Sequence, residues 1–501
     1  MRLTRPSAIA FLMAALLIIT GCSGRSATAD QTPKHGELRA STHYLLVGLS
    51  IVRYELGHIY VPENRARPDS RLIAVRYMRI KGTTKEAAPP VFMLPGGPGD
   101  SYIEAFTKSG LDWFGAFKQR RDVLRFRRAG DVVVMDQRGA SGPSERLGFN
   151  HNPDGQSLDR PARLDDELEA APSVVRRALA RYPDHDLAGY TVVQCAEDLN
   201  DLRVALGYAK INLFGLSYGS QWSFAVMRLH PETVERALLS GVEPLDNSYD
   251  MPSHVWAALM RIAAEAEVDP RLSASLPRGG IRQAVDETLS RLEEATLTVR
   301  LKSGEQVVLG PEDFKLNLVA RPSEWPARII AIHQGRYEAW AEEVAASRRP
   351  LRDAPAALIG PLIDTSLNVS KTRGRLLAND PAVRYLGTWG FAPSMAAASL
   401  WPTPDVGDEF RLPITSPIPV VFLHGDWDTS TPIENSLEMQ RYFPNSRLVI
   451  VRRGGHGAIY DLADQNPGVL DHLLDYLKTG DMTDLPRHVV LAQPKFKAPL
   501  P

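Results

Sequence analysis

The chain has 501 residues, of which 44% are hydrophobic and 23% charged, an ordinary globular composition that is long enough for two or more structural units. Its 58 Lys and Arg side chains balance 59 Asp and Glu side chains, which leaves a net charge of −1. No general electrostatic field draws such a protein to nucleic acid, so we expect no nucleic-acid partner.

The N-terminus has the pattern of an export signal. Arg2 and Arg5 precede an apolar run over residues 8–19, which is short for a membrane span and has the charge order of a secretory signal. The run ends in ITGC, which resembles the bacterial lipobox, and this resemblance implies lipidation of Cys22. We therefore expect a lipoprotein signal peptide over 1–21 and an exported bacterial lipoprotein whose lipid on Cys22 holds it on the extracytoplasmic side of a membrane. A plain signal peptide or an uncleaved anchor is the alternative.

Residues 22–44 are rich in Ser, Thr, Ala, Gln and Lys and have no apolar periodicity, which predicts a flexible tether. The other cysteine of the chain, Cys195, lies among apolar residues at helical spacing. We interpret it as a small buried side chain rather than a nucleophile, and we expect no disulfide.

An α/β pattern follows the tether. Short apolar runs that stop at turns alternate with helical patterns, and uniformly apolar strands are typical of a mainly parallel, doubly wound sheet that is covered on both faces. The runs lie at 55–63, 71–80, 89–99, 130–139, 210–215 and 236–241, with helices expected at 192–206 and 221–230.

This rhythm is then interrupted by long amphipathic helices, which are expected at 254–267, 281–295 and 325–346. It resumes with strands expected at 419–425 and 447–452 and helices at 432–442 and 468–478. We therefore predict an α/β core over 45–243 and 411–490, a large helical insert, or lid, over 244–410, and a loose tail over 491–501.

The segment GLSYGS places Ser217 in a G-x-S-x-G arrangement between an expected strand and an expected helix. A serine at the tip of such a turn is strained and exposes its hydroxyl, and the flanking glycines allow neighbouring backbone to approach closely. This context favours Ser217 as a nucleophile over a structural turn residue.

A serine hydroxyl needs a base that takes its proton. Among the 12 histidines, His456 follows the last apolar strand in the glycine-rich segment RRGGHG, and it fits the chain order serine, acid, histidine that enzymes with the G-x-S-x-G turn have. We predict that His456 is the base; the alternative is an exposed loop histidine.

The charge that develops on a substrate carbonyl needs backbone N–H donors placed in advance, each worth about 10²–10³ in turnover. The residue after the nucleophile, Tyr218, is expected to supply one donor. The loop MLPGGPGDS follows an early strand, and its Gly96 and Gly97 expose amides without side chains, so we expect the second donor there. Alone, the GGPG segment could be only a tight turn.

The segments PGGPGDS, VVVMDQRGASGPS, GLSYGS and GDWDTSTP, followed by GGHG, together resemble the α/β-hydrolase serine peptidases of the prolyl-aminopeptidase and tripeptidyl-aminopeptidase group, in particular its secreted bacterial branch. The resemblance extends over about 55–476. It implies Ser217 as nucleophile, His456 as base, an aspartate after the seventh strand, the GGPG loop as oxyanion strand, and a helical lid over a pocket for a short peptide N-terminus. There are two departures: Pro95 stands where prolyl aminopeptidases usually have histidine, and the insert lacks the cysteines that secreted members often carry.

Two aspartates, Asp426 and Asp428, compete for the role of the acid that orients His456. Asp426 directly follows the glycine at the strand end, where turn-forming carboxylates are common. Asp428 precedes TSTP, whose Thr431 and Pro432 are typical of an N-cap and a first helical position. The family's acid usually lies three residues after the glycine, so the resemblance also favours Asp428 and leaves Asp426 to order the loop.

An aminopeptidase must also hold the substrate's ammonium group, because burying that charge unpaired is costly. Glu243, at the junction of core and insert, is our first candidate, and Asp246 is the second. Either carboxylate could equally be a cap or turn residue.

These features predict a serine hydrolase that removes short pieces from the N-termini of peptides through an acyl-enzyme. A carboxylesterase or lipase with the same triad is the first alternative, and a catalytically inactive surface-binding protein is the second. The sequence has no H-E-x-x-H motif and no carboxylate cluster at ligand spacing, so we expect no metal and no cofactor. No obligate protein partner is predicted.

Overall fold

The computed structural model describes residues 32–47, 50–84, 88–108, 112, 115–142, 145–351 and 356–498. The chain separates into two units, Met1–Lys34 and His35–Pro501, and the second carries all the elements described below. The predicted signal peptide, the predicted lipid site at Cys22 and part of the predicted tether lie outside the described residues.

Ten strands of the described residues form one sheet, in the order β1-β2-β3-β5-β4-β9-β10-β14-β15-β16. They are β1 (Leu38–Val47), β2 (Ser50–Pro62), β3 (Leu72–Ile80), β4 (Val91–Leu94), β5 (Val132–Met135), β9 (Ile211–Leu216), β10 (Val234–Ser240), β14 (Val420–Gly425), β15 (Ser446–Arg452) and β16 (His488–Val490). Neighbours from β1 to β5 pair antiparallel, and neighbours from β5 to β16 pair parallel. The predicted mainly parallel sheet is confirmed.

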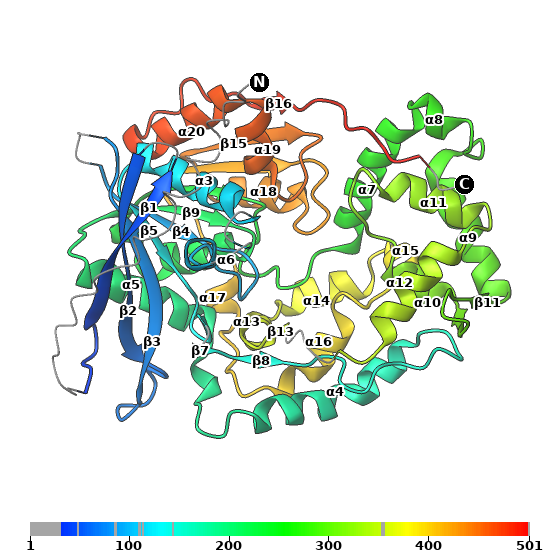
Figure 1. Ribbon diagram of the computed structural model, residues 1–501, viewed down its shortest axis with the longest axis horizontal. Coiled ribbons are helices and arrows are strands. Elements are labelled where there is room, and N and C mark those ends of the chain that lie inside the picture. Colours follow the sequence, from blue (N-terminus) through cyan, green and yellow to red (C-terminus); the bar gives the residue numbers. More distant parts are fainter. Residues whose placement is uncertain are drawn as a thin grey trace, which may run out of the picture. The chain divides into compact units, whose positions relative to one another are not determined.

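Helices cover both faces of this sheet (Figure 1). Successive residues of β14 show the alternation, since Phe422 packs into one apolar cluster and Leu423 into another. The Phe422 cluster includes residues of α4 (Leu164–Ala180), α5 (Val192–Ala205), α6 (Tyr218–Leu229), α13 (Ile359–Leu367) and α18 (Ile433–Gln440). The Leu423 cluster includes residues of α1 (Glu104–Thr107), α3 (Phe117–Arg125), η1 (Phe126–Arg128), α19 (Ala458–Gln465) and α20 (Pro467–Thr479). Burial on both faces explains why these strands are uniformly apolar.

The chain between β10 and β14 is mainly helical, and much of it packs around an apolar cluster of its own. Its remaining helices are α7 (Pro252–Glu267), α8 (Pro270–Ser273), α9 (Gly280–Glu294), α10 (Pro311–Leu316), α11 (Trp325–His333), α12 (Glu338–Arg348), α14 (Lys371–Ala378), α15 (Val383–Leu386), α16 (Ala392–Ala397), η4 (Ala398–Leu400) and α17 (Asp408–Arg411). The single helix expected over 325–346 is two helices, because the chain turns at Gly335 with a φ of 84°. A hairpin of β11 (Leu297–Arg300) and β12 (Gln306–Leu309) was also not expected.

The core and the insert interlock along residues 148–180. The short strand β8 (Gly148–Phe149) pairs with β13 (Ala356–Ala357) of the insert, and α4 packs against α16. The other short elements are β6 (Ala140–Ser141), β7 (Glu145–Arg146), η2 (Leu187–Gly189) and η3 (Pro231–Thr233). A stretch that the sequence assigned to the core thus also supports the insert.

Both ends of the expected core need correction. β1 begins at Leu38 and pairs with β2, so a tether reaching residue 44 is wrong from that point on. The side chains of this edge strand are mostly exposed, which is why it carries no apolar periodicity. At the other end, Phe496 is only 2% exposed and packs beside Trp427, with ring centroids 6.2 Å apart, so this part of the tail is not loose. Figure 1 shows the red C-terminal trace running from β16 to the region of α7 and α11.

Candidate active site

Ser217 lies at the turn between β9 and α6, as the motif predicts. Its φ is 58° and its ψ −129°, a strained backbone conformation for a residue with a side chain. A Cβ added at Gly219 would come within 2.1 Å of Leu94 O, and one at Gly215 within 2.4 Å of Gly219 O. The two glycines therefore permit the close approach of backbone that this turn requires.

His456 follows β15, and its Nδ1 lies 2.9 Å from Oδ2 of Asp428. His456 and Ser217 both line a cavity of about 400 Å³, together with Gly96 and Gly97. The structure thus brings together the serine and the histidine singled out from sequence, with Asp428 behind the histidine.

The electrostatics of the pair match this arrangement. Burial opposes the charge of Asp428, but hydrogen bonds from His424 and His456 outweigh burial and hold its pKa well below the ordinary value. Burial also lowers the pKa of His456, but the hydrogen bond and the negative charge of Asp428 outweigh it and raise that pKa. The pair therefore favours an ionised aspartate beside an imidazole of enhanced basicity.

Asp428 is also anchored by the turn that follows it. Its Oδ1 accepts hydrogen bonds from the backbone N–H groups of Ser430 (2.9 Å) and Thr431 (3.0 Å). Thr431 Oγ1 donates to its Oδ2 at 2.9 Å. The interpretation of Thr431 and Pro432 as N-cap and first helical residue is wrong, because α18 begins at Ile433 with Pro432 as its N-cap residue.

Sequence reasoning missed a second histidine beside Asp428. The Nε2 of His424 lies 2.6 Å from Thr431 O and 3.3 Å from Asp428 Oδ2. A carbonyl oxygen only accepts, so this nitrogen carries the proton. Nδ1 lies 2.6 Å from Ser436 Oγ. The one available signal was a histidine inside the apolar strand VVFLHG.

Asp426 turns away from this group. Its Oδ1 accepts the backbone N–H of Arg453 at 2.7 Å, and Arg453 has a φ of 65°. Asp426 therefore ties the loop after β14 to the loop after β15, which is the ordering role expected for it.

The residues expected to supply the oxyanion donors lie beside Ser217. A Cβ at Gly96 would lie 3.2 Å from Ser217 Cβ, and Gly97 lines the same cavity. Tyr218 is the first residue of α6, where backbone N–H groups have no intrahelical acceptor. The N–H of Tyr218 is therefore available as an oxyanion donor.

Glu243, which follows β10, lies close enough to three aspartates for their charges to act on it. Burial and the negative charges of Asp250, Asp364 and Asp428 raise the pKa of Glu243 well above its ordinary value. Burial also raises the pKa of Asp364 to about 7 and that of Asp250 to about 6. Among the described residues, no cationic side chain pairs with Glu243 or Asp364. Asp364 lies on α13, in a segment where the sequence offered no motif.

Asp246, the second candidate for the ammonium group, is engaged elsewhere. It accepts hydrogen bonds from the backbone N–H and from Oγ of Ser370, the N-cap residue of α14. Its carboxylate fixes the start of that helix, which makes it a structural residue.

Neither a metal cluster nor a membrane span appears in the part of the chain that the structure describes. No group of three His, Cys, Asp or Glu side chains there could hold a metal ion. No helix there combines the length and the apolar character needed to cross a membrane.

Comparisons with known proteins agree with the fold. The α/β hydrolase fold family matches residues 89–283, and the TAP-like protein family matches residues 380–487. The serine protease Hip1 of Mycobacterium tuberculosis is 28% identical over 271 residues, which cover 49% of each chain, so this chain spans about half the length of that relative. The tripeptidyl aminopeptidase of Streptomyces lividans is 24% identical over 487 residues, which cover 85% of this chain and 82% of the relative. Together with the sheet and the serine turn, these matches agree with an α/β-hydrolase fold, and the C-terminal part of the chain is similar to the TAP-like protein family.

Proposed function

We propose that this protein is a serine aminopeptidase that removes short N-terminal pieces from peptides through an acyl-enzyme. Ser217 attacks the scissile carbonyl, and His456 accepts its proton through Nε2, because Nδ1 faces Asp428. Asp428 fixes this tautomer and stabilises the imidazolium that forms. The N–H groups of Gly97 and Tyr218 bind the oxyanion, with Gly96 beside them.

The leaving peptide takes the proton from His456 as the carbon–nitrogen bond breaks. Water then attacks the acyl-enzyme, with His456 again as base, and releases the N-terminal fragment. The steps need only groups of this chain and water. The names of the two relatives, a serine protease and a tripeptidyl aminopeptidase, support peptide as the substrate class.

The carboxyls of Glu243 and Asp364 are the observation that carries the aminopeptidase assignment. Both lack a cationic partner among the described residues, and burial raises both pKa values. A substrate ammonium group between them would supply the missing charge, and its arrival would ionise them. Esters and acylated peptides offer no such charge. We therefore propose that Glu243, with Asp364, holds the free amine, and that the helical insert over 244–410 serves as a lid over it.

A panel of chromogenic substrates tests the assignment: aminoacyl, prolyl and tripeptidyl amides with free or acetylated amines, beside simple acyl esters. We expect the free amides to be preferred and acetylation to abolish turnover, while Ser217→Ala removes activity on all substrates and remains folded. A preference for esters, or indifference to acetylation, would establish the carboxylesterase alternative instead.

We also propose that the protein is exported and anchored by lipid on Cys22. The basic residues, apolar run and ITGC segment of the N-terminus support this. In a bacterial host, radiolabelled palmitate should enter the wild-type protein and not the Cys22→Ser variant, which should also leave the membrane fraction. Equal labelling of both proteins would exclude this cysteine as the lipid site.

A further inference from the structure

The loop that follows β5 holds the GGPG loop by side-chain contacts. Gln137 Nε2 donates to Gly96 O at 3.2 Å, and Gln137 Oε1 accepts from Gly99 N–H at 2.7 Å. The partners assign the two ends of the carboxamide, because a carbonyl only accepts and an N–H only donates. Beside these contacts, Ser101 Oγ donates to Asp136 Oδ1 at 2.5 Å. Gln137 and Asp136 are both fully buried, so water does not compete for these bonds.

The two neighbours of Gln137 in sequence are fixed as well. Arg76 Nε donates to Asp136 Oδ2 at 2.7 Å. Arg138 donates to both carboxylate oxygens of Asp198, at 2.8 and 2.6 Å, a bidentate pair inside the protein. Gln137 therefore extends from a rigid segment.

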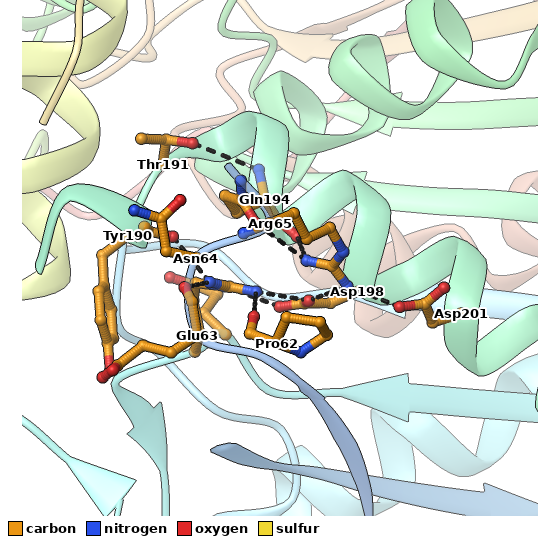
Figure 2. Close-up of polar contacts among 12 residues, drawn as sticks. Pro62, Glu63, Asn64, Arg65, Tyr190, Thr191, Gln194, Asp198 and Asp201 are labelled. Atoms are coloured by element: carbon orange, nitrogen blue, oxygen red, sulfur yellow. Dashed lines mark hydrogen bonds and ion pairs between the residues drawn. The ribbon is translucent and has the colours of Figure 1, made fainter. Parts of the chain in front are cut away.

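The surroundings of Arg138 strengthen this anchor. Its Nη1 donates to the main-chain oxygens of Glu63 (2.5 Å) and Gly189 (2.7 Å). Figure 2 shows Asp198 and Asp201 of α5 facing Arg65, whose Nη2 lies 2.7 and 2.6 Å from their oxygens. The end of β2, the helix α5 and the loop after β5 are thus joined in one network.

The bond between Gln137 and Gly96 determines the direction of the next N–H. The peptide between Gly96 and Gly97 is trans, and in a trans peptide the C=O and the N–H point to opposite sides. Holding Gly96 O toward Gln137 therefore turns the N–H of Gly97 away from Gln137. Within the described residues this N–H has no acceptor, and Gly97 shares its cavity with Ser217.

A Gly–Gly peptide has little steric resistance to rotation, so its orientation needs an external constraint. We propose that Gln137 is the positioning residue of the oxyanion hole. Its carboxamide holds the Gly96–Gly97 peptide so that Gly97 N–H faces the oxygen that becomes negative when Ser217 attacks. The inference rests on the proposed serine mechanism, and adds the residue that keeps the donor in place before substrate arrives.

The test compares Gln137→Met with wild type on matched oxygen and thiono esters of one acyl group. Sulfur accepts hydrogen bonds poorly, so hydrolysis of the thionoester gains little from the oxyanion hole. We expect kcat on the oxygen ester to fall about 10–100-fold with KM changed by less than about three-fold, and the preference for oxygen over sulfur to shrink by a similar factor. Titration with a fluorophosphonate measures the concentration of enzyme with a reactive serine, and kcat is calculated per such molecule.

A second variant and a control distinguish a loss of positioning from a general folding defect. Gln137→Glu retains an acceptor for Gly99 N–H, but as a carboxylate it cannot donate to Gly96 O and repels it, so kcat should fall at least as far as with Met. Asn212→Leu is the matched control. Asn212 is a buried amide at the opposite end of β9, and its Nδ2 donates to Leu477 O (2.6 Å) and Pro89 O (3.3 Å). This variant should lower Tm and retain the wild-type ester preference.

Full kcat in both Gln137 variants, or equal losses on oxygen and thiono esters, would overturn the inference. So would a change of ester preference in Asn212→Leu as large as in Gln137→Met. If Ser217→Ala remains active, the proposed mechanism fails instead, because the nucleophile itself has then been misassigned.

Discussion

His424 and His456 approach the same oxygen: Nε2 of His424 and Nδ1 of His456 lie 3.3 and 2.9 Å from Oδ2 of Asp428. Only His456 reaches the cavity that contains Ser217. The other histidine is fully buried and faces main-chain and hydroxyl groups. One imidazole is therefore in a position to react, and the other supports the acid.

Mutation of the two aspartates in the GDWD segment should have very different effects on kcat. Asp428→Asn removes the charge that stabilises the imidazolium and should lower kcat by about 10⁴, as an asparagine in this position of a triad does. Asp426→Asn leaves His456 untouched and should lower kcat less than ten-fold. Both are measured as kcat under saturating substrate. Equal losses would show that the acid has been misassigned.

Removing His424 should affect stability and catalysis together. His424→Phe leaves Thr431 O without its donor in a buried site, a cost of about 1–3 kcal/mol in the free energy of unfolding. It also removes one polar contact to the Asp428 carboxylate while those from Ser430 and Thr431 remain, so kcat should fall modestly. The glutamine of His424→Gln can still donate a hydrogen bond to Thr431 O, so it should recover part of the stability and part of kcat. Denaturant unfolding measures the first and steady-state kinetics the second. A Gln variant no better than Phe would contradict a hydrogen-bonding role.

The acid limb of the pH profile should reflect His456. The imidazole must be neutral to accept the serine proton, and Asp428 raises its pKa above the ordinary value of 6.5. The value of kcat/KM should therefore fall as pH drops through a pKa above 6.5, and remain high on the alkaline side. In Asp428→Asn the raising charge is gone, so the limb should move to lower pH. If the acid limb does not move in Asp428→Asn, then a group other than His456 controls it.

Glu243→Gln and Asp364→Asn should each raise KM for substrates with a free amine and leave simple esters nearly unchanged, because only an ammonium group needs these charges. Asp246→Asn is the matched control, since that carboxylate holds Ser370 and should affect Tm rather than amine preference. Steady-state kinetics on free and acetylated substrates measure the difference. An Asp246 variant with the same loss of preference would point to a general distortion of the insert.

Local patterns predicted the parts of the site that local sequence controls. The Ser217 turn needs two glycines and a strand-to-helix junction, so it can be read within ten residues. Asp428 was preferred to Asp426 from the family resemblance and from a capping interpretation that the structure corrects. His424, Gln137 and Asp364 could not be read in this way. Their contacts join segments that come together only in the folded sheet. His424 is marked only as a histidine in an apolar strand, and the segment around Gln137 carries the family resemblance without indicating a role for its side chain.

The fold was predictable to the same extent. Strands buried on both faces are uniformly apolar and were recognised, whereas β1 is an exposed edge strand without that signal. The break between α11 and α12 had a visible cue in Gly335, which apolar periodicity on both sides concealed. Tertiary contacts decide the remainder, such as the pairing of β8 with β13.

Trp427 lies between the two aspartates of the acid loop, yet its ring belongs to the apolar cluster of the helical insert, where Phe496 packs against it. The insert is therefore not an exchangeable module. A chimera that transplants residues 244–410 alone would remove the partners of Trp427 and loosen the acid that the chemistry needs. An insert taken from another protein must also provide an apolar site for Trp427 and Phe496. A change of insert that alters the substrate range will therefore alter the catalytic geometry as well.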